Sequence, residues 1–532
     1  MLNLDTSDPK EQAIANALIQ RFDRDPFLKL FREWVVDANI SFRQPEHCRL
    51  RRIFEYLNPS IVMTNAHLSH DTVGRRIVDL YLRQKTRIID HLRSVPDQIH
   101  IAFDGWRSRN RHALYGIDCF YVDKNGIPSK LVLGLQELKN CYSGENIAAQ
   151  ILEILESYEI LDKVGYITLD NAGNMDTAME EIAGTLGFDP KKRRVRCFGD
   201  VLNLVAKALL FGYKAEAFEA EVDGESGFGT ARHEIWRKIG PIGKLHNLVH
   251  WIHRSDKLTY RLRALQEEFF QHSDNPKIRA RKPVYVVRDN QTRWLSTLYM
   301  MRRGLLLRPF LEDLECRNGA RRREEMPLCL REERLLGEKD WKVIELMNKV
   351  LLDFEEALRM LEGDAQSRAS TGNYPDPEHF RINIDLGWDK LNKYFTKLYE
   401  TPAYYASAIL NPVSRWGYFE NAWSDRAQLP WFQEAKRMVK ALWEEEYEPL
   451  PTLDLLSVPP MSAECERLFS VAGQMVSPLR TRLEASTIGM TQTLRSCVRN
   501  GLVDAADSLI DVSEEVGNSV IWEAEEDDLD AG

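Results

Sequence analysis

The sequence predicts an α/β domain with a mixed sheet, flanked on both sides by all-α regions. Three short runs rich in β-branched and aromatic residues follow one another at 99–103, 113–122 and 131–138. Two further runs, 164–169 and 194–198, alternate with segments whose apolar residues recur at helical spacing. Three consecutive strands, followed by helices that alternate with strands, are typical of a mixed sheet covered by helices.

The region before the sheet, residues 1–95, has the pattern of a helical N-terminal region. Its apolar residues recur at helical spacing over 27–35 and 77–92. Between these segments lies a basic and aromatic cluster, which could be a packed surface helix or a nucleic-acid contact: Arg49, Arg51, Arg52, Phe54 and Tyr56. We expect this helical region to end where the first strand begins.

The α/β domain is expected to span residues 96–212 and to close with an apolar helix at 201–211. Beyond Gly212 the strand signals largely disappear, and residues 213–450 are predicted to form a helical block. The strongest helical patterns of this block are at 244–268, 294–311, 341–361 and 386–399.

The C-terminal part of the chain begins with a break at Pro459-Pro460. Ser462, which follows, has the residue type of a helix cap, and Glu466 suits the positive end of a helix dipole. We therefore assign residues 451–503 to a final helical unit. Residues 504–532 are strongly acidic and are predicted to be disordered.

Composition excludes several classes of protein. A chain of 532 residues is too long for one ordinary domain, and its net charge of −10 excludes a uniformly basic nucleic-acid binder but not local basic patches. The eight cysteines form no C-x-x-C pair, which argues against a disulfide scaffold or a zinc finger. No apolar run is long enough to span a membrane and the N-terminus lacks a signal-peptide pattern, so we expect an intracellular protein without a membrane partner.

Three carboxylates stand at positions where chemistry is expected. Asp104 and Asp170 each end a strand, at the rim of the sheet where ligands of open α/β sheets bind. Glu466 lies early on the helix that follows Ser462. Taken singly, such residues are turn or cap residues. Together they would be the set of hard oxygen ligands that holds a pair of Mg²⁺ ions for phosphodiester chemistry.

Six blocks of the sequence, in the expected order, resemble the hAT superfamily of cut-and-paste DNA transposases. The resemblance runs from about residue 30 to 503. The blocks are Phe103-Asp104-Gly105-Trp106, Leu169-Asp170-Asn171-Ala172-Gly173-Asn174-Met175, the segment 196–204 with Cys197 and Asp200, the segment 289–296 with Arg293-Trp294, the segment 404–412 and the segment 462–473 with Glu466.

The resemblance implies a ribonuclease H-like core that the helical block interrupts as a large insertion. It implies that Asp104, Asp170 and Glu466 are the acidic ligands of Mg²⁺ or Mn²⁺ in a DDE-type site for DNA cleavage and strand transfer. Arg293 and Trp294 would contact the DNA end. Cys197, Asp200 and Arg467 would support the site. DNA is the implied partner, and the nucleus is the implied location.

The C-terminal segment resembles the hAT dimerisation region and implies a homodimer or higher homo-oligomer. Its apolar residues offer a plausible partner face: Leu483, Ile488, Met490, Leu494, Val498 and Leu502.

Three departures from the family pattern bear on activity. The family usually has Cys-x-x-His where this chain has Cys197 and Asp200, which adds negative charge beside the carboxylates. Cys497 stands where the family often has Trp, and no Cys pair with a downstream His pair of a BED-type zinc finger precedes Asp104. Two hypotheses follow: an active transposase, or a domesticated, catalytically inactive nuclear factor that binds DNA or protein.

Two further clusters have open or structural interpretations. The basic run Lys191, Lys192, Arg193 and Arg194 could contact the phosphate backbone, act as an import signal or be a solvated connection, and the same choice applies to the basic segment 277–282. His246, His250 and His253 share one side of a helix. Since we find no acidic or Cys partner near them, we interpret them as a half-exposed structural face and not as a metal site.

Overall fold

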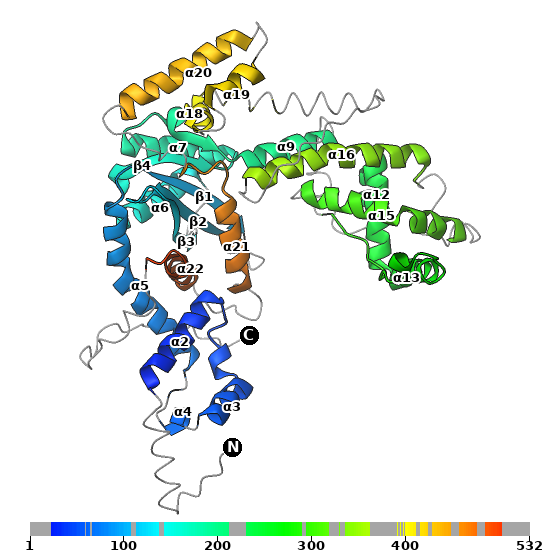
Figure 1. The fold of residues 1–532 in the computed structure, drawn as a ribbon, viewed down its shortest axis with the longest axis horizontal. Coiled ribbons are helices and arrows are strands. Elements are labelled where there is room, and N and C mark those ends of the chain that lie inside the picture. The colour runs from blue at the N-terminus through cyan, green and yellow to red at the C-terminus, as the bar shows by residue number, and fades with distance from the viewer. Residues whose placement is uncertain are drawn as a thin grey trace, which may run out of the picture.

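The computed structural model is drawn in Figure 1. It describes residues 23–502 except for the following positions: 59, 64–65, 67, 108–112, 138–142, 212–229, 290–293, 319–328, 330–335, 362–390, 392–393, 395–396, 398–399, 411–414, 424–427, 448–456 and 476–484. The predicted acidic tail, 504–532, lies outside the described residues.

A five-stranded mixed sheet in the order β3-β2-β1-β4-β5 forms the centre of the protein. β1 (Ile99–Arg107), β2 (Ala113–Val122) and β3 (Pro128–Glu137) are antiparallel neighbours. β4 (Val164–Leu169) pairs in parallel with β1, and β5 (Arg194–Arg196) pairs in parallel with β4. The predicted mixed α/β domain is confirmed, with each strand close to its predicted position.

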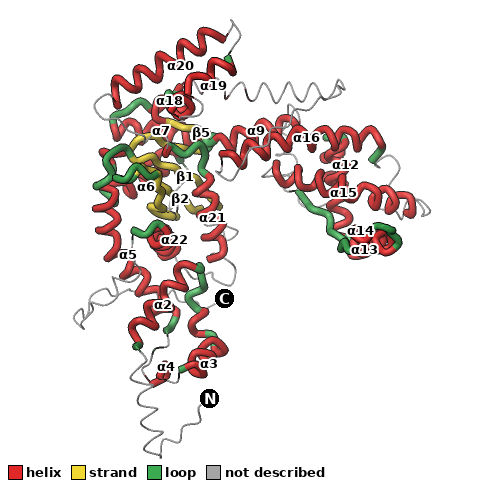
Figure 2. Tube along the Cα trace, viewed as in Figure 1, coloured by secondary structure: helices red, strands yellow, loops and turns green. Residues whose placement is uncertain are grey.

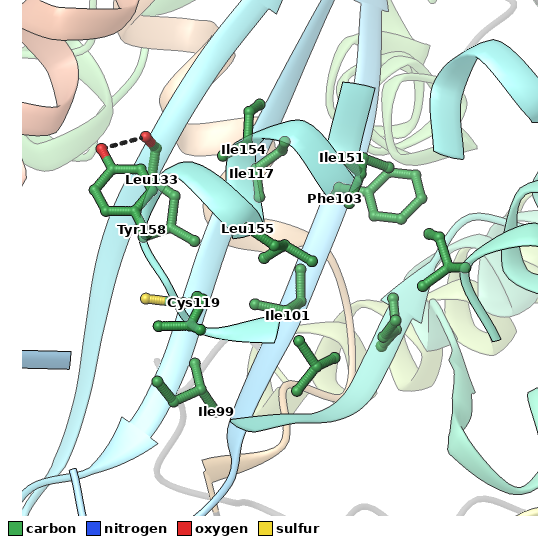
Figure 3. Close-up of a cluster of buried hydrophobic side chains, with 14 of the residues drawn as sticks. Ile99, Ile101, Phe103, Ile117, Cys119, Leu133, Ile151, Ile154, Leu155 and Tyr158 are labelled. Carbon is green, nitrogen blue, oxygen red and sulfur yellow. Dashed lines mark hydrogen bonds between the residues drawn. The ribbon is translucent and has the colours of Figure 1, made fainter. Parts of the chain in front are cut away.

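One face of the sheet packs against α6 (Gly144–Ser157) and α7 (Gly173–Leu186). Alternate residues of β1 point to this side, because successive side chains of a strand face opposite ways. Figure 3 shows this core, in which the Tyr158 hydroxyl donates to the Leu133 carbonyl at 2.8 Å. The buried residues that it labels are Ile99, Ile101, Phe103, Ile117, Cys119, Leu133, Ile151, Ile154, Leu155 and Tyr158.

The opposite face carries the two C-terminal helices, α21 (Ala463–Met475) and α22 (Ala485–Arg499). The α22 helix lies against β3 and also contacts helices of the N-terminal region. That region is helical as predicted: α2 (Arg24–Asp37), α3 (Cys48–Leu57), α4 (Ser60–Met63) and α5 (His70–Arg93). Chain segments more than 350 residues apart in sequence thus share one hydrophobic core.

Packing of α22 corrects the predicted dimer face. Ile488 and Leu494 are buried inside the chain, and Leu502 packs partly buried against the core beside α6 and α7. Cys497, where a Trp was expected from the family pattern, is fully buried in that same core. These residues are therefore used within one chain, and Leu483 lies outside the described residues.

The predicted helical block falls into two groups (Figures 1 and 2). The first follows α9 (Phe198–Phe211) away from the sheet and has its own apolar core, built around residues such as Leu245, Leu298 and Trp341. We call it the helical arm. It comprises α11 (Thr230–Arg237), α12 (Pro241–Arg254), α13 (Asp256–Gln271), α14 (Pro276–Arg279), α15 (Trp294–Asn318) and α16 (Glu338–Leu361).

The second group, α18 (Ala403–Leu410), α19 (Arg415–Ala422) and α20 (Leu429–Leu442), returns to the sheet. Ala403, Ala406 and Leu442 pack against Tyr166 of β4 and Val195 of β5. The edge of the sheet formed by β5 is covered in this way. Among the described residues, no helix is both long and apolar enough to cross a membrane.

Candidate active site

Asp104 lies within β1, three residues before the end of the strand and not at the strand end that the sequence predicted, because β1 stays paired with β2 up to Arg107. Two donors bind its carboxylate. The Gly105 amide donates to Oδ1 at 2.7 Å, and the Ser462 hydroxyl donates to Oδ2 at 3.3 Å. Ser462 immediately precedes α21, so the predicted helix start is confirmed. Its hydroxyl, however, binds Asp104 and the Cys197 Sγ atom (3.6 Å), where the sequence had predicted a cap on the helix amides.

Asp170 follows β4, the strand that pairs with β1, so both aspartates lie at the same edge of the sheet. Its Oδ1 accepts from the Ala172 amide at 2.9 Å, in the short turn before α7. Its carbonyl accepts from the buried Arg194 side chain at 3.1 Å. The turn is therefore tied to β5 through a guanidinium.

Glu466 is carried by α21, and the packing of that helix on β1 and β2 sets its place. Cys465, the preceding residue, is fully buried and donates to Asp118 Oδ2 at 3.0 Å. Phe469 stacks on Trp106 of β1 with ring centroids 6.0 Å apart. The side chain of Glu466 itself lies on the exposed side of the helix.

Gly116 of β2 allows α21 to approach the sheet. It pairs with Asp104 in the β1–β2 ladder. A Cβ atom at Gly116 would lie 2.9 Å from Leu468 Cδ2 and 3.1 Å from Phe469 Cε1. Real Cβ atoms essentially never come within 3.0 Å of another heavy atom, so even alanine would require the Leu468 side chain to shift, and a large side chain would collide with both Leu468 and Phe469. This is a positioning residue that the sequence patterns did not reveal.

Asp104, Asp170, Asp200 and Glu466 form what we call the acidic cluster. Burial, followed by the negative charges of Asp170 and Asp200, raises the pKa of Asp104 to about 8. Burial and the charge of Asp170 raise the pKa of Asp200 to about 6, with a further contribution from Glu466. Burial also raises the pKa of Asp170. Carboxylates from four separate parts of the chain therefore repel one another, and a bound cation would relieve this repulsion.

Asp200 lies on the first turn of α9, three residues beyond the buried Cys197. Burial and the charge of Asp200 raise the pKa of the Cys197 thiol to about 12, so the sulfur is protonated at neutral pH. The charge of Asp200 also contributes to the raised pKa of Asp104. The family pattern places a histidine at this position, and here the position carries a fourth negative charge.

The oxygen atoms of the acidic cluster are more widely spaced than those of a single-ion site. In the described part of the chain, only His246, His250 and Asp289 bring three ligand atoms within 4.8 Å of one another. A site for two ions about 4 Å apart spreads its ligands more widely than that. The donor set, hard carboxylate oxygens without imidazole or thiolate, is the type that Mg²⁺ prefers.

The residues of the predicted basic run differ in exposure and in their partners. Lys191 and Lys192 are exposed on α8 (Pro190–Arg193), and Lys192 forms an ion pair of 3.4 Å with Glu445. Arg193 donates to Gln98 at 2.6 Å. Arg194 is buried and forms an ion pair with Asp176. The predicted phosphate contact of Arg194 is wrong in this structure, because its guanidinium is occupied inside the core.

Other predicted residues lie apart from the cluster or cannot be placed beside it. Arg293 is outside the described residues, and Trp294 begins α15 in the arm. Arg467, predicted to support the site, forms an ion pair with Glu464, which also pairs with Lys130 of β3 at 2.6 Å. Glu464 is thereby engaged with β3.

Arg194 also lines a cavity of about 280 Å³. It combines apolar and aromatic walls with cationic side chains, and the sequence analysis did not predict it. Its lining consists of Arg194, Arg196, Phe198, Val201, Leu391, Tyr394, Lys397, Glu400 and Tyr404.

The histidines of α12 also differ from their predicted environment. His246 and His250 are buried and both approach the buried carboxylate of Asp289, at 2.8 and 3.4 Å. Asp289 lies 39 residues beyond His250 in sequence, so the spacing of the histidines gave no sign of it. The predicted half-exposed face is wrong for these two residues, and only His253 of the three is exposed.

Comparisons with known proteins agree with this architecture. Residues 102–193 match the family model of the ZBED1 RNase-like domain, and residues 451–496 match that of the hAT family C-terminal dimerisation region. The first match covers β1 to α8, with Asp104 and Asp170. The second covers α21 and most of α22, with Glu466.

Three curated relatives match parts of the chain. A putative AC transposase of Zea mays is 24% identical over 66% of this chain and 38% of its own length. A putative AC9 transposase of Zea mays is 24% identical over 35% of this chain and 23% of its own length. A putative transcriptional regulator, tpeD, of Talaromyces stipitatus is 20% identical over 53% of this chain and 32% of its own length.

The chain thus spans less than two fifths of the length of each of these relatives. The first family model matches most of the sheet and the second matches the final helices, in the order that the sequence blocks predicted. These two models and the transposase relatives show that the chain is similar to hAT-family transposases.

Proposed function

We propose that this protein is a metal-dependent DNA transposase of the hAT type, in which Asp104, Asp170 and Glu466 hold Mg²⁺ or Mn²⁺. The observation that supports the proposal is the position of Asp104 on β1 and of Asp170 just after β4, the neighbouring parallel strand, with α21, which carries Glu466, packed on β1 and β2. The charges of Asp170 and Glu466 both contribute to the raised pKa of Asp104. Two such ions, when bound, would stabilise the attacking and leaving oxygens of a phosphodiester displacement.

The chain's own groups prepare this site. The Gly105 and Ala172 amides orient the carboxylates of Asp104 and Asp170. The Ser462 hydroxyl joins Asp104 to the start of α21, so the helix that carries Glu466 is tied to β1 next to the site. In this proposal the core is ribonuclease H-like, and the helices between α9 and α21 are a large insertion into it.

DNA binding, nuclear location and self-association complete the proposal. The exposed Lys191 and Lys192 lie on α8, which connects α7 to β5, and are candidates for contact with the phosphate backbone. Arg293 and Trp294 would contact the DNA end from the arm. Dimerisation would proceed through the C-terminal region, using surfaces other than the buried Ile488 and Leu494.

A second candidate function has its own support. Asp200 contributes to the raised pKa of Asp104, and the relative tpeD is described as a putative transcriptional regulator. A chain that keeps the fold but not catalysis would act as a nuclear DNA- or protein-binding factor. In that case Asp200 would weaken metal binding because it adds a negative charge where an imidazole would have supported the ligands.

Strand cleavage of hairpin-prone DNA with Mg²⁺ or Mn²⁺ separates the two functions. We expect the wild type to nick or transfer strands, and Glu466→Gln to lose this activity. Glu464→Gln is the matched control, because Glu464 lies on the same helix but pairs with Lys130. A wild type no more active than Glu466→Gln would refute the enzyme hypothesis, and DNA binding without cleavage would then support the factor.

An Asp200→His variant tests the origin of any weak activity. It replaces the fourth negative charge with the residue type of the family pattern. We expect faster cleavage than wild type if the charge of Asp200 limits metal binding. An unchanged rate would show that Asp200 does not limit the reaction.

A further inference from the structure

The helical arm contains a cluster of metal-ligating side chains that is separate from the acidic cluster. His246 and His250 are one turn apart on α12, and Asp289 lies in the segment before α15. We call these three residues the histidine cluster. Their ligand atoms all lie within 4.8 Å of one another. Two histidines at i and i+4 on one helix face, joined by a carboxylate, form a donor set that suits Zn²⁺.

The distances match a site that is almost assembled. His246 Nδ1 is 2.8 Å and His250 Nε2 is 3.4 Å from the same carboxylate oxygen of Asp289. Donor atoms of a tetrahedral zinc site lie about 3.3 Å apart, given zinc–ligand bonds of about 2.0 Å. The two nitrogen-to-carboxylate distances are thus within a few tenths of an ångström of this spacing, and the two imidazole nitrogens lie within 4.8 Å of each other.

Burial and packing fix these donors in place. The side chains of His246, His250 and Asp289 are 6%, 11% and 1% exposed. The ring of Trp236 stacks on His246 at 3.5 Å between centroids, and His246 stacks on His250 at 4.1 Å. The imidazoles are thus held in orientation by their neighbours, as in metal sites with a supporting shell.

The carboxylate also has capacity for a further ligand. Asp289 Oδ2 is buried and accepts no hydrogen bond from the described residues. A buried carboxylate oxygen without a donor is costly, and a cation is one way to satisfy it. Nitrogen donors favour Zn²⁺ over Mg²⁺, which prefers oxygen alone.

We propose that His246, His250 and Asp289 bind one Zn²⁺ ion, with water as the fourth ligand, and that this ion ties α12 to the segment leading into α15. Binding would displace any proton shared between His246 and Asp289 into solvent. The site joins parts of the arm that are more than 35 residues apart in sequence. The ion would therefore stabilise the fold of the arm.

Metal content of the full chain tests this proposal. The protein is stripped with EDTA and incubated with ZnCl₂, and bound zinc is measured by elemental analysis and calorimetry. All variants are made on an Asp104→Asn/Glu466→Gln background, which removes the acidic cluster as a competing site. We expect one equivalent of Zn²⁺ in this background, and binding weakened by at least about tenfold by Asp289→Asn or His250→Gln.

His253→Gln is the matched control, because His253 lies on the same helix but is exposed. It should keep the full equivalent. Replacement of Zn²⁺ by Co²⁺ gives a second readout: a tetrahedral site of nitrogen and oxygen donors shows visible ligand-field bands without a thiolate charge-transfer band. Circular dichroism verifies that each variant is folded.

Two results would overturn the proposal. The first is a background protein, folded and stripped, that takes up no zinc above the buffer level. The second is zinc uptake that Asp289→Asn and His250→Gln leave unchanged, or a cobalt spectrum that shows thiolate ligation. The histidine cluster would then be a buried ion pair and not a metal site. Because the acidic cluster is removed in these proteins, neither result bears on the proposed DNA cleavage.

Discussion

The acidic cluster of the core and the histidine cluster of the arm both surround a buried aspartate, but they change its pKa in opposite directions. Asp104 faces other carboxylates, and its pKa rises to about 8. Asp289 faces two imidazoles, whose hydrogen bonds hold its pKa well below the ordinary value in spite of burial. Burial raises the pKa of both aspartates, and the charges and hydrogen bonds of their neighbours either add to this effect, as at Asp104, or outweigh it, as at Asp289.

The two clusters also differ in the groups that the fold places around the aspartate. One carboxylate oxygen of Asp289, Oδ1, forms a hydrogen bond with His246 within the arm. Among its described neighbours, Asp104 receives hydrogen bonds from neutral groups, and the charges that shift its pKa are negative. Only the acidic cluster therefore gains stability when a carboxylate is neutralised. The following substitutions test this contrast, from the largest expected effect to the smallest.

Gly116→Leu should produce the largest change, because it separates the core elements that assemble the acidic cluster. The new side chain would collide with Leu468 and Phe469 of α21. We expect a loss of about 3 kcal/mol in the free energy of unfolding, together with loss of DNA cleavage. Urea unfolding followed by circular dichroism measures the first effect. Gly184→Leu, at a glycine with open space around its missing Cβ atom, is the control.

Asp289→Asn should destabilise the arm at neutral pH by about 2 kcal/mol, since it removes a charge that two imidazoles stabilise. The lowered pKa of Asp289 means that its contribution is present above the unfolded-state pKa of about 4 and is lost as pH falls through the lower folded value. The destabilisation should therefore shrink in strong acid. Equal destabilisation at all pH values would contradict the assignment.

Asp104→Asn should instead stabilise the metal-free protein. We expect its free energy of unfolding at pH 8 to rise by about 1 kcal/mol, roughly the energy of one pKa unit. The substitution removes the repulsion from Asp170 and Asp200. Thermal unfolding in EDTA gives the comparison. A variant less stable than wild type under these conditions would show that Asp104 is favourably paired in its charged form.

The pH dependence of the wild type follows from the same residue. The folded state holds a proton on Asp104 up to about pH 8, and the unfolded state loses it near pH 4. The native protein therefore binds more protons in this window, and the free energy of unfolding in EDTA should fall as pH rises from about 4 to 8. Asp104→Asn should flatten this slope, and saturating Mg²⁺ should offset it.

Arg467→Gln should produce the smallest change. Arg467 is exposed and pairs with Glu464, and exposed ion pairs contribute about 0.5 kcal/mol. Chemical unfolding should place the variant within that range of the wild type. A loss of several times that value would mean that Arg467 stabilises the start of α21 in a way that its ion pair does not explain.

The core was largely predictable from sequence because its signals are local. Runs rich in β-branched and aromatic residues marked the strands, and Asp170 could be placed directly after a strand from sequence order alone. Asp104 was predicted to end its strand as well, but β1 continues to Arg107 because it remains paired with β2. Glu466 could be joined to them only through the family resemblance, since no local pattern shows that α21 returns to β1. The close approach at Gly116 depends on side chains some 350 positions away, which no sequence pattern of β2 contains.

The helices of the arm could be predicted from the sequence, but the histidine cluster could not. The spacing of His246 and His250 showed that they share a helix face, yet their burial depends on Trp236 and on the path of residues 280–289. The C-terminal apolar residues illustrate the converse case. A stripe such as that of Ile488 and Leu494 fits a partner chain or the same chain equally well, and tertiary packing on β3 decided it.

Calorimetric binding of Mn²⁺ to the stripped protein tests the central claim, that the acidic cluster is a divalent-cation site, most directly. We predict saturable binding to the wild type that is lost in the Asp104→Asn/Glu466→Gln double variant and retained in Asp289→Asn. Equal Mn²⁺ binding by the wild type and the double variant, or no saturable binding by either, would contradict the account.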